Sequence, residues 1–92
     1  MDDGPIVWDE DNHHHLFVEH RDPRPSEPEV VEALTSPARE EKPDPEREGL
    51  IAVLALTTTG RWVFVVWIEH GGGRYPIHSR YADTRTRRRY GR

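Results

Sequence analysis

Apolar residues are concentrated in two seven-residue runs in the second half of the chain, separated by polar residues. Residues 50–56 are continuously apolar, which is typical of a strand buried on both faces, although a short buried helix has the same pattern. Residues 61–68 are largely β-branched and aromatic, which favours a second strand. Glycine-containing turns at 57–60 and 70–73 flank this strand, and residues 74–81 form a third. These patterns predict an antiparallel meander.

The first half of the chain predicts one short strand and two helices. The apolar run at residues 6–8 follows a Gly-Pro pair and predicts the short strand. Acidic residues come next, and they favour the start of a helix that extends to about Arg21, just before a proline. Ser26 and Glu29 match the capping box, so a second helix is expected to begin there and to end at Pro37.

Two further segments complete the predicted fold. Residues 36–48 hold eight charged residues and three prolines, which indicates a solvated loop without regular structure. After the last strand, Asp83 or Thr84 can cap a short helix that reaches Tyr90. The predicted order is β-α-α-β-β-β-α, an α+β fold whose helices pack on one face of the meander sheet. Residues 1–92 are short enough to form a single domain.

The net charge of −4 conceals a strong polarity along the chain. Residues 1–60 contain five Lys or Arg against fifteen Asp or Glu, and residues 61–92 contain eight arginines against two acids. This polarity favours an anionic partner for one face, although charged surface also serves solubility alone. The chain has no cysteine, which excludes disulfides and thiolate metal sites and fits a reducing cytoplasm. No signal peptide is visible, and no apolar run approaches the roughly 20 residues that span a bilayer.

The last strand and the segment after it carry most of the positive charge. Alternation along residues 74–81 is expected to place Arg74, His78 and Arg80 on one face, opposite the core. Arginine suits phosphate because its planar guanidinium donates two hydrogen bonds at once. An ion pair between Arg80 and Asp9 or Glu19 is the structural alternative. The residues predicted to bind RNA are Arg74, His78, Arg85, Arg88 and Arg89.

Four histidines of the first predicted helix offer a second kind of chemistry. His13, His14 and His15 are consecutive, so on a helix they point about 100° apart and cannot share one metal ion. No metal site is therefore predicted. His20, at the end of that helix, can act as a general acid or base because an unperturbed imidazole titrates near neutrality. A capping or packing role for His20 is the alternative.

Several motifs, taken in order, resemble those of one protein family. "SEPEVVEAL" in the first half and "TTTGRWVFVVWIEHGGGRYPIHSRYADTRTRRRY" in the second are similar to BrnT-type toxins, which belong to the RelE/ParE-like toxins of bacterial toxin–antitoxin systems. The resemblance implies a RelE-like fold and a ribonuclease that inhibits translation and is neutralised by a BrnA-like antitoxin. It matches Arg80 to the family's strand-end arginine, Arg61 to its hairpin arginine, and His20 to the histidine at the end of its first helix. Cleavage of RNA by its own 2′-hydroxyl requires no metal, so no cofactor is expected.

The resulting hypothesis is a metal-independent endoribonuclease. Arg80 and Arg61 would bind the phosphate, and His20 or Tyr90 would transfer a proton. The expected partners are RNA, free or on the ribosome, and the antitoxin, through which oligomers could form. The alternative is a protein of the same fold that binds nucleic acid or antitoxin without cleavage. The two-arginine hypothesis requires Arg61 and Arg80 to converge on one surface.

Overall fold

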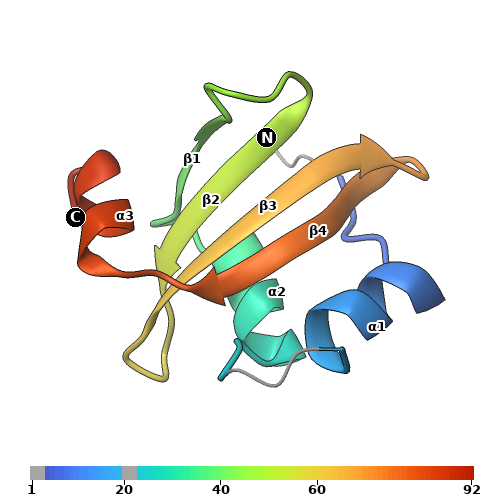
Figure 1. Ribbon diagram of the computed structural model, residues 1–92, viewed down its shortest axis with the longest axis horizontal. Helices are drawn as coiled ribbons and strands as arrows, with labels where there is room; N and C mark the ends of the chain where they lie inside the picture. The colour runs from blue at the N-terminus through green and yellow to red at the C-terminus, as the bar shows by residue number, and fades with distance from the viewer. Residues whose placement is uncertain (1–3, 20–22) are drawn as a thin grey trace.

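A four-stranded antiparallel sheet forms the centre of the computed structural model, which describes residues 4–19 and 23–92 (Figure 1). Three helices accompany the sheet in this part of the chain, so the class is α+β, as predicted. The elements in chain order are α1 (Glu10–Phe17), α2 (Glu27–Thr35), β1 (Glu40–Pro43), β2 (Leu50–Leu56), β3 (Trp62–His70), β4 (Gly73–Tyr81) and α3 (Thr84–Arg89).

The strands follow one another across the sheet in the order β1-β2-β3-β4, which confirms the predicted meander. Four consecutive residues of β2, from Ala52 to Ala55, are buried, as expected for a strand covered on both faces. Gly60 lies in the turn between β2 and β3, and Gly71 and Gly72 lie in the turn between β3 and β4. All three have positive φ (82°, 63° and 81°), which glycine adopts without steric cost.

The two faces of the sheet are packed against different parts of the chain. We call the side that carries Val53, Val63, Val65 and Trp67 the covered face, because these residues form one core cluster with α2. Phe17 of α1 packs against the same cluster. The opposite side is called the open face, and its central positions are Ala52, Leu54, Phe64, Val66, His78 and Arg80.

The last helix lies on the open face, whereas all helices were expected on one face. Thr86 of α3 accepts a hydrogen bond from Arg80 at 2.9 Å. The Arg87 guanidinium lies over the Trp62 ring, with 5.0 Å between the guanidinium carbon and the ring centroid. The helix α3 thereby partly covers the aromatic and aliphatic side chains of β2 and β3 on this side as well. A strand with apolar residues at every position is stable only when both of its faces are buried.

Local capping explains where the first two helices begin. Ser26 and Glu29 form the predicted capping box at α2, each side chain bonding to the backbone N–H of the other. Asp9 and Asn12 form the same arrangement at α1. The α1 helix ends at Phe17, four residues before the expected end, and residues 20–22 lie outside the described part of the chain. None of the helices in that described part has the length and apolar composition that crossing a bilayer requires.

Two segments differ from the predicted strand pattern. The run at residues 6–8 makes only one bridge, between Ile6 and Arg74, instead of a full strand. Gly73 permits this approach, since a Cβ atom there would lie 2.3 Å from the carbonyl oxygen of Pro5. In the charged segment 36–48, which was expected to lack regular structure, residues 40–43 form the edge strand β1. Charged residues and proline are common on edge strands because they oppose further pairing.

A β-bulge in the last strand changes which side chains face the helices. The register between β3 and β4 shifts between Val66 and Trp67, so Trp67 pairs with Pro76 and Val66 with His78. Strict alternation of side chains along residues 74–81 predicted that Arg74 and His78 would lie on the same face. The extra residue instead puts Arg74 on the covered face, while His78 and Arg80 stay on the open face.

Candidate functional site

Arg80 is held in place on the open face by two neighbours. It pairs with Phe64 across β3 and β4, and its guanidinium carbon lies 4.7 Å from the centroid of the Phe64 ring. The guanidinium also donates a hydrogen bond to the Thr86 hydroxyl at 2.9 Å. In the described part of the chain, no carboxylate forms an ion pair with Arg80, so the alternative pairing with Asp9 or Glu19 is not found.

A depression of about 210 Å³ opens beside Arg80, and we call it the basic depression. The lining residues come from the sheet, from α3 and its C-cap, and from residues 44–47. The sheet contributes Ala52, Phe64, His78 and Arg80, and α3 with its C-cap contributes Thr86, Arg89 and Tyr90. Arg47 contributes a third guanidinium, within 3.4 Å of the Asp44 carboxylate. The depression therefore combines three cations with aromatic rings and two carboxylates.

His78 is a neutral imidazole in this depression. Burial lowers the pKa of His78 from 6.5 to about 4, and the positive charge of Arg80 contributes to the same shift. The ring lies edge-on to Phe64, with centroids 6.3 Å apart. The imidazole is therefore unprotonated at pH 7 and has a ring nitrogen free to accept a proton, but a pKa of about 4 makes it a weaker base than an ordinary histidine.

Tyr90 contributes a protonated hydroxyl to the same depression. Burial raises the pKa of Tyr90 above its ordinary value, and the Asp44 carboxylate acts in the same direction. Its ring lies against Phe64 at a centroid distance of 6.3 Å, and the Lys42 ammonium lies 4.3 Å from the ring centroid. Tyr90 therefore keeps its proton near neutral pH and can donate a hydrogen bond, while the raised pKa makes it a weaker acid than an ordinary tyrosine. The predicted residues Arg80, His78, Arg89 and Tyr90 thus lie together.

Arg61 does not belong to this group, which corrects the predicted two-arginine site. Its guanidinium lies over the Tyr81 ring, with 4.7 Å between the guanidinium carbon and the ring centroid. Tyr81 is on the covered face, where its hydroxyl donates to the Glu29 carboxylate at 2.8 Å. Arg61 lines a separate hollow, and Arg80 has no part in that lining. Tyr81, which holds Arg61, and Phe64, which holds Arg80, belong to adjacent residue pairs of the β3–β4 ladder. Adjacent pairs point to opposite faces of a sheet, so the two arginines lie on different faces.

Arg74 was predicted to bind RNA, but its side chain is buried. Only 5% of its surface is exposed. Its guanidinium donates to the carbonyl oxygen of Leu34 at 2.5 Å and to that of Gly4 at 3.1 Å. A buried arginine that caps the end of α2 and ties down the N-terminal segment has a structural role. Arg85 and Arg88 are exposed on α3, but neither lines the basic depression.

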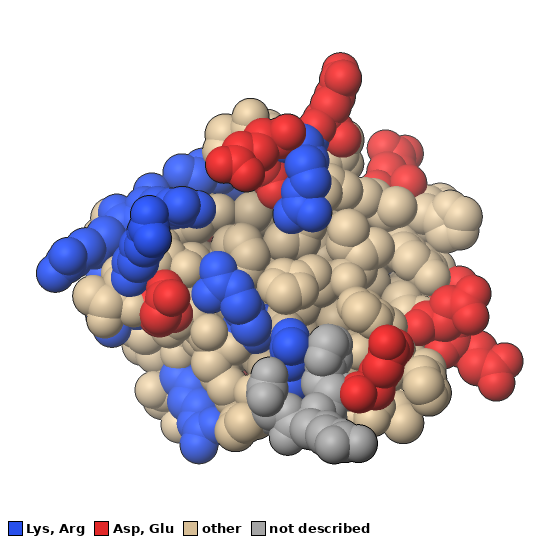
Figure 2. All heavy atoms as spheres, viewed as in Figure 1, with Lys and Arg blue, Asp and Glu red and all other residues tan. Residues whose placement is uncertain are grey.

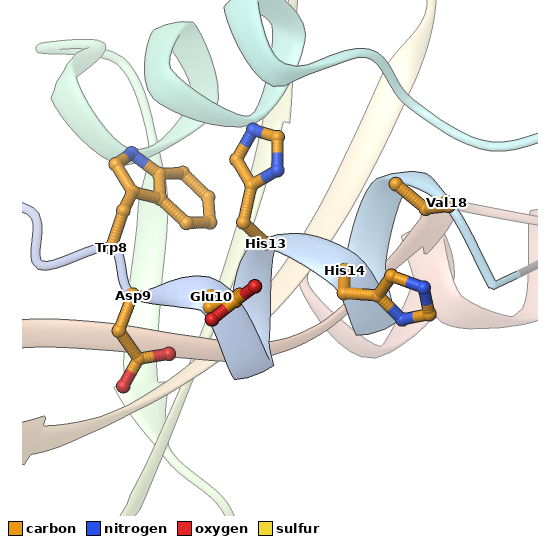
Figure 3. Close-up of a pocket in the computed structure, with 6 residues that line it drawn as sticks. All are labelled: Trp8, Asp9, Glu10, His13, His14 and Val18. Atoms are coloured by element: carbon orange, nitrogen blue, oxygen red, sulfur yellow. The ribbon is translucent and has the colours of Figure 1, made fainter.

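No histidine of α1 lines the basic depression, and His13 and His14 line another hollow. Figure 3 shows this hollow, where Trp8 and His13 point toward one side and His14 toward another. The His13 ring contacts the Glu27 carboxylate at 2.5 Å and packs edge-on against Trp8. Within the described residues, no cluster of His, Asp or Glu could hold a metal ion. His20 lies outside the described residues.

Positive charge gathers on the part of the surface that holds the basic depression, with acidic residues of the β1–β2 connection beside it. Figure 2 shows Lys and Arg gathered over α3 and the adjoining part of the sheet, while the visible Asp and Glu lie mainly at the top, over the β1–β2 connection, and at the right. Seven lining residues were not predicted as site residues, namely Asp44, Pro45, Glu46, Arg47, Ala52, Phe64 and Thr86. Arg47 and Asp44 belong to the segment interpreted as a solvated loop, and Phe64 could have been found by its position opposite Arg80 in a meander.

The low pKa of His78 gives a direct test of this geometry. We expect the His78 ring to titrate in the folded protein with a midpoint of about 4, measured by NMR from its carbon-bound ring protons. Replacing Arg80 by glutamine should raise this midpoint, but it should remain below 6.5 because burial is the larger cause. The exposed Arg85→Gln variant is the matched control and should leave it unchanged. A midpoint near 6.5 in the unmodified protein would show that His78 is not buried beside Arg80.

The lowered pKa of His78 also makes the free energy of unfolding depend on pH. The unfolded chain binds this proton near pH 6.5 and the folded chain only near pH 4. The unfolded state therefore binds more protons between these values, so the contribution of His78 to the free energy of unfolding falls as pH drops from 6.5 to 4.

No family model, no curated protein and no solved structure matches the chain.

Proposed function

We propose that this chain is a ribonuclease that holds an RNA phosphate in the basic depression. One observation carries the proposal: Arg80, the neutral imidazole of His78 and the protonated hydroxyl of Tyr90 line the same small depression. Arginine binds phosphate through paired hydrogen bonds, and the other two groups have the protonation states that an acid–base pair requires. Arg89 supplies a second positive charge in place of Arg61.

These groups suffice for cleavage of RNA by its own 2′-hydroxyl. His78 accepts the proton of the 2′-hydroxyl while the 2′-oxygen attacks the adjacent phosphorus. Arg80 stabilises the charge that develops on the phosphate oxygens, and Phe64 and Thr86 keep its guanidinium oriented. The bond between phosphorus and the 5′-oxygen breaks, and Tyr90 donates its proton to that leaving oxygen. The products are a 2′,3′-cyclic phosphate and a 5′-hydroxyl.

The biological role that fits this activity is that of a RelE-like toxin that inhibits translation in the bacterial cytoplasm. The BrnT-type motifs around Arg80 and the α+β meander support this part of the proposal. On this basis the expected partners are RNA and a cognate BrnA-like antitoxin encoded beside the chain. Recovery of such a partner by co-expression would support the assignment independently of catalysis.

The decisive experiment is an RNA cleavage assay with purified protein. We expect end-labelled RNA to be cleaved, alone or on translating ribosomes, with a cyclic phosphate on the 5′ fragment. RNA that carries a single 2′-deoxy residue at the cleavage site should remain intact at that position, because the attacking hydroxyl is missing. Binding without cleavage in both settings would support the alternative of a non-catalytic binding protein. Cleavage of the 2′-deoxy substrate would exclude the proposed chemistry.

A further inference from the structure

A hollow of about 390 Å³ lies along α1, and we call it the α1 hollow. Figure 3 shows its lining residues, which are Trp8, Asp9, Glu10, His13, His14 and Val18. Glu10, His13 and His14 are exposed and share one side of the helix, because they are spaced i, i+3, i+4. The buried residues of α1, Asn12 and Leu16, lie on another side. The hollow is therefore formed by the part of α1 that does not pack into the core.

Apolar groups form the two ends of the α1 hollow. The Trp8 ring packs on Phe17, with centroids 5.3 Å apart, and against the core cluster, which holds the ring in place. At the other end, 61% of the Val18 surface is exposed. Figure 3 shows the labelled side chains of α1 between these two residues. A lone exposed valine is ordinary on a protein surface, but one that shares a hollow with a tryptophan offers apolar area that a second molecule can cover.

One carboxylate of the lining remains available to a ligand. The Asp9 carboxylate already accepts hydrogen bonds from a backbone N–H of α1 at 3.0 Å and from the Tyr75 hydroxyl at 2.8 Å. Each histidine of the lining contacts a glutamate, at 2.5 Å for His13 and at 3.8 Å for His14. Within residues 4–19 and 23–92, by contrast, the Glu10 carboxylate has no ion pair. Glu10 can therefore bind a cation without losing an internal contact.

The charge around the α1 hollow decides which kind of occupant fits it. Residues 4–19 contain four Asp or Glu and no Lys or Arg. This negative potential repels RNA and other polyanions and attracts cations. Lysine and arginine combine an aliphatic stem, which packs on apolar surface, with a charged end that reaches a carboxylate. Trp8 suits the stem and Glu10 the charged end, so a basic side chain matches both the apolar and the acidic part of the lining.

We propose that the α1 hollow is a docking site for a basic segment of a partner protein. A lysine or arginine of that segment lays its stem against Trp8 and binds the Glu10 carboxylate, and a neighbouring aliphatic side chain covers Val18. The inference goes beyond the proposed ribonuclease activity and does not depend on it, because the α1 hollow shares no lining residue with the basic depression.

The test uses a fluorescein-labelled peptide of twelve residues in which arginines alternate with leucines. Binding to the full chain is followed by fluorescence anisotropy without RNA, and NMR follows the indole N–H of Trp8, which should shift on binding. We expect the double variant Glu10→Gln/Val18→Ser to weaken binding about tenfold or more, because one charge-assisted contact and one apolar contact are lost. Both positions are exposed, so the variant should fold.

The matched control is Glu48→Gln/Leu56→Ser. It removes the same charge and another strongly exposed aliphatic side chain, and neither residue lines the α1 hollow. Binding of the peptide to this control should change less than about threefold. Thermal melts of both variants verify folding.

Each other outcome overturns the proposal. Failure of the basic peptide to bind, or equal binding of a peptide with glutamine in place of arginine, excludes a basic occupant. Equal weakening by the two double variants, or a Trp8 signal that does not shift, indicates non-specific charge attraction. Binding of tetramethylammonium as tightly as the peptide assigns the hollow to a small organic cation. Self-association that Glu10→Gln/Val18→Ser abolishes assigns it to a second copy of this chain.

Discussion

Replacing Arg80 by alanine is expected to lower the rate of RNA cleavage about 10²–10³-fold, the usual loss when one donor to a developing oxyanion is removed. The guanidinium is the group that the sheet, Phe64 and Thr86 all orient toward the basic depression. Arg80→Lys should recover little of this loss, since an ammonium has no planar fork to bind two phosphate oxygens. Single-turnover cleavage of end-labelled RNA measures the effect, and growth arrest on expression reports it in cells.

The controls follow from the separation of the two arginine sites. Arg61→Ala removes a guanidinium that does not line the basic depression, so cleavage should stay within about threefold of the unmodified protein. Arg85→Ala removes an exposed positive charge from α3 and should behave in the same way. If Arg61→Ala reduced cleavage as strongly as Arg80→Ala, the site would include both arginines, and the geometry described above would be wrong. Equal activity of Arg80→Ala and the unmodified protein would remove Arg80 from the mechanism.

The parts of the fold that local chemistry determines could be predicted from the sequence. The capping box of Ser26 and Glu29 lies within four residues, and the structure contains it as expected. The strands β2 and β3 are dense in β-branched and aromatic residues, and positive-φ glycines separate the strands. Strands that follow one another in the sequence lie next to one another in the sheet. A meander therefore needs no long-range information to be recognised.

The positions of the arginines depend on details that strict alternation ignores. One extra residue in β4 moves Arg74 to the covered face, although Arg80, six positions later, stays on the open face. Pro76 beside the bulge was a usable signal, because a proline within a strand is confined to edges and bulges. Arg61 pointed to a phosphate site only through the family resemblance, and no local pattern indicated that Tyr81 would hold it.

The edge strand and the face on which the last helix packs were mispredicted for a different reason, although the helix itself was predicted with its Asp83 cap. Residues 40–43 have almost no apolar content, so hydrophobic periodicity cannot identify them as a strand. They become one because β2 offers an unpaired edge and because Glu41 accepts a hydrogen bond from the Trp67 indole at 3.1 Å. In α3, Thr86 and Arg87 face the sheet, yet nothing in their sequence pattern distinguishes one face of the sheet from the other.

Replacing the buried Arg74 by leucine is expected to destabilise the protein by about 3 kcal/mol, because carbonyl groups that now accept charge-assisted hydrogen bonds lose their donor. Leu34 lies in the last turn of α2, where carbonyl oxygens have no partner within the helix, and Gly4 lies in the N-terminal segment. Leucine can fill part of the space but cannot donate to either group. Urea unfolding followed by tryptophan fluorescence measures the change in the free energy of unfolding.

Arg85→Leu is the control for this substitution, since it also replaces an arginine by leucine, but at an exposed position. Its free energy of unfolding should change by no more than about 0.5 kcal/mol. Hydrogen exchange gives a second readout in Arg74→Leu. The amide of Val7, which donates to the Arg74 carbonyl at 2.7 Å, should lose protection before the amides of β2 and β3 as the N-terminal segment detaches. A variant as stable as the unmodified protein, with Val7 still protected, would show that Arg74 does not hold these segments together and would return it to the candidates for RNA binding.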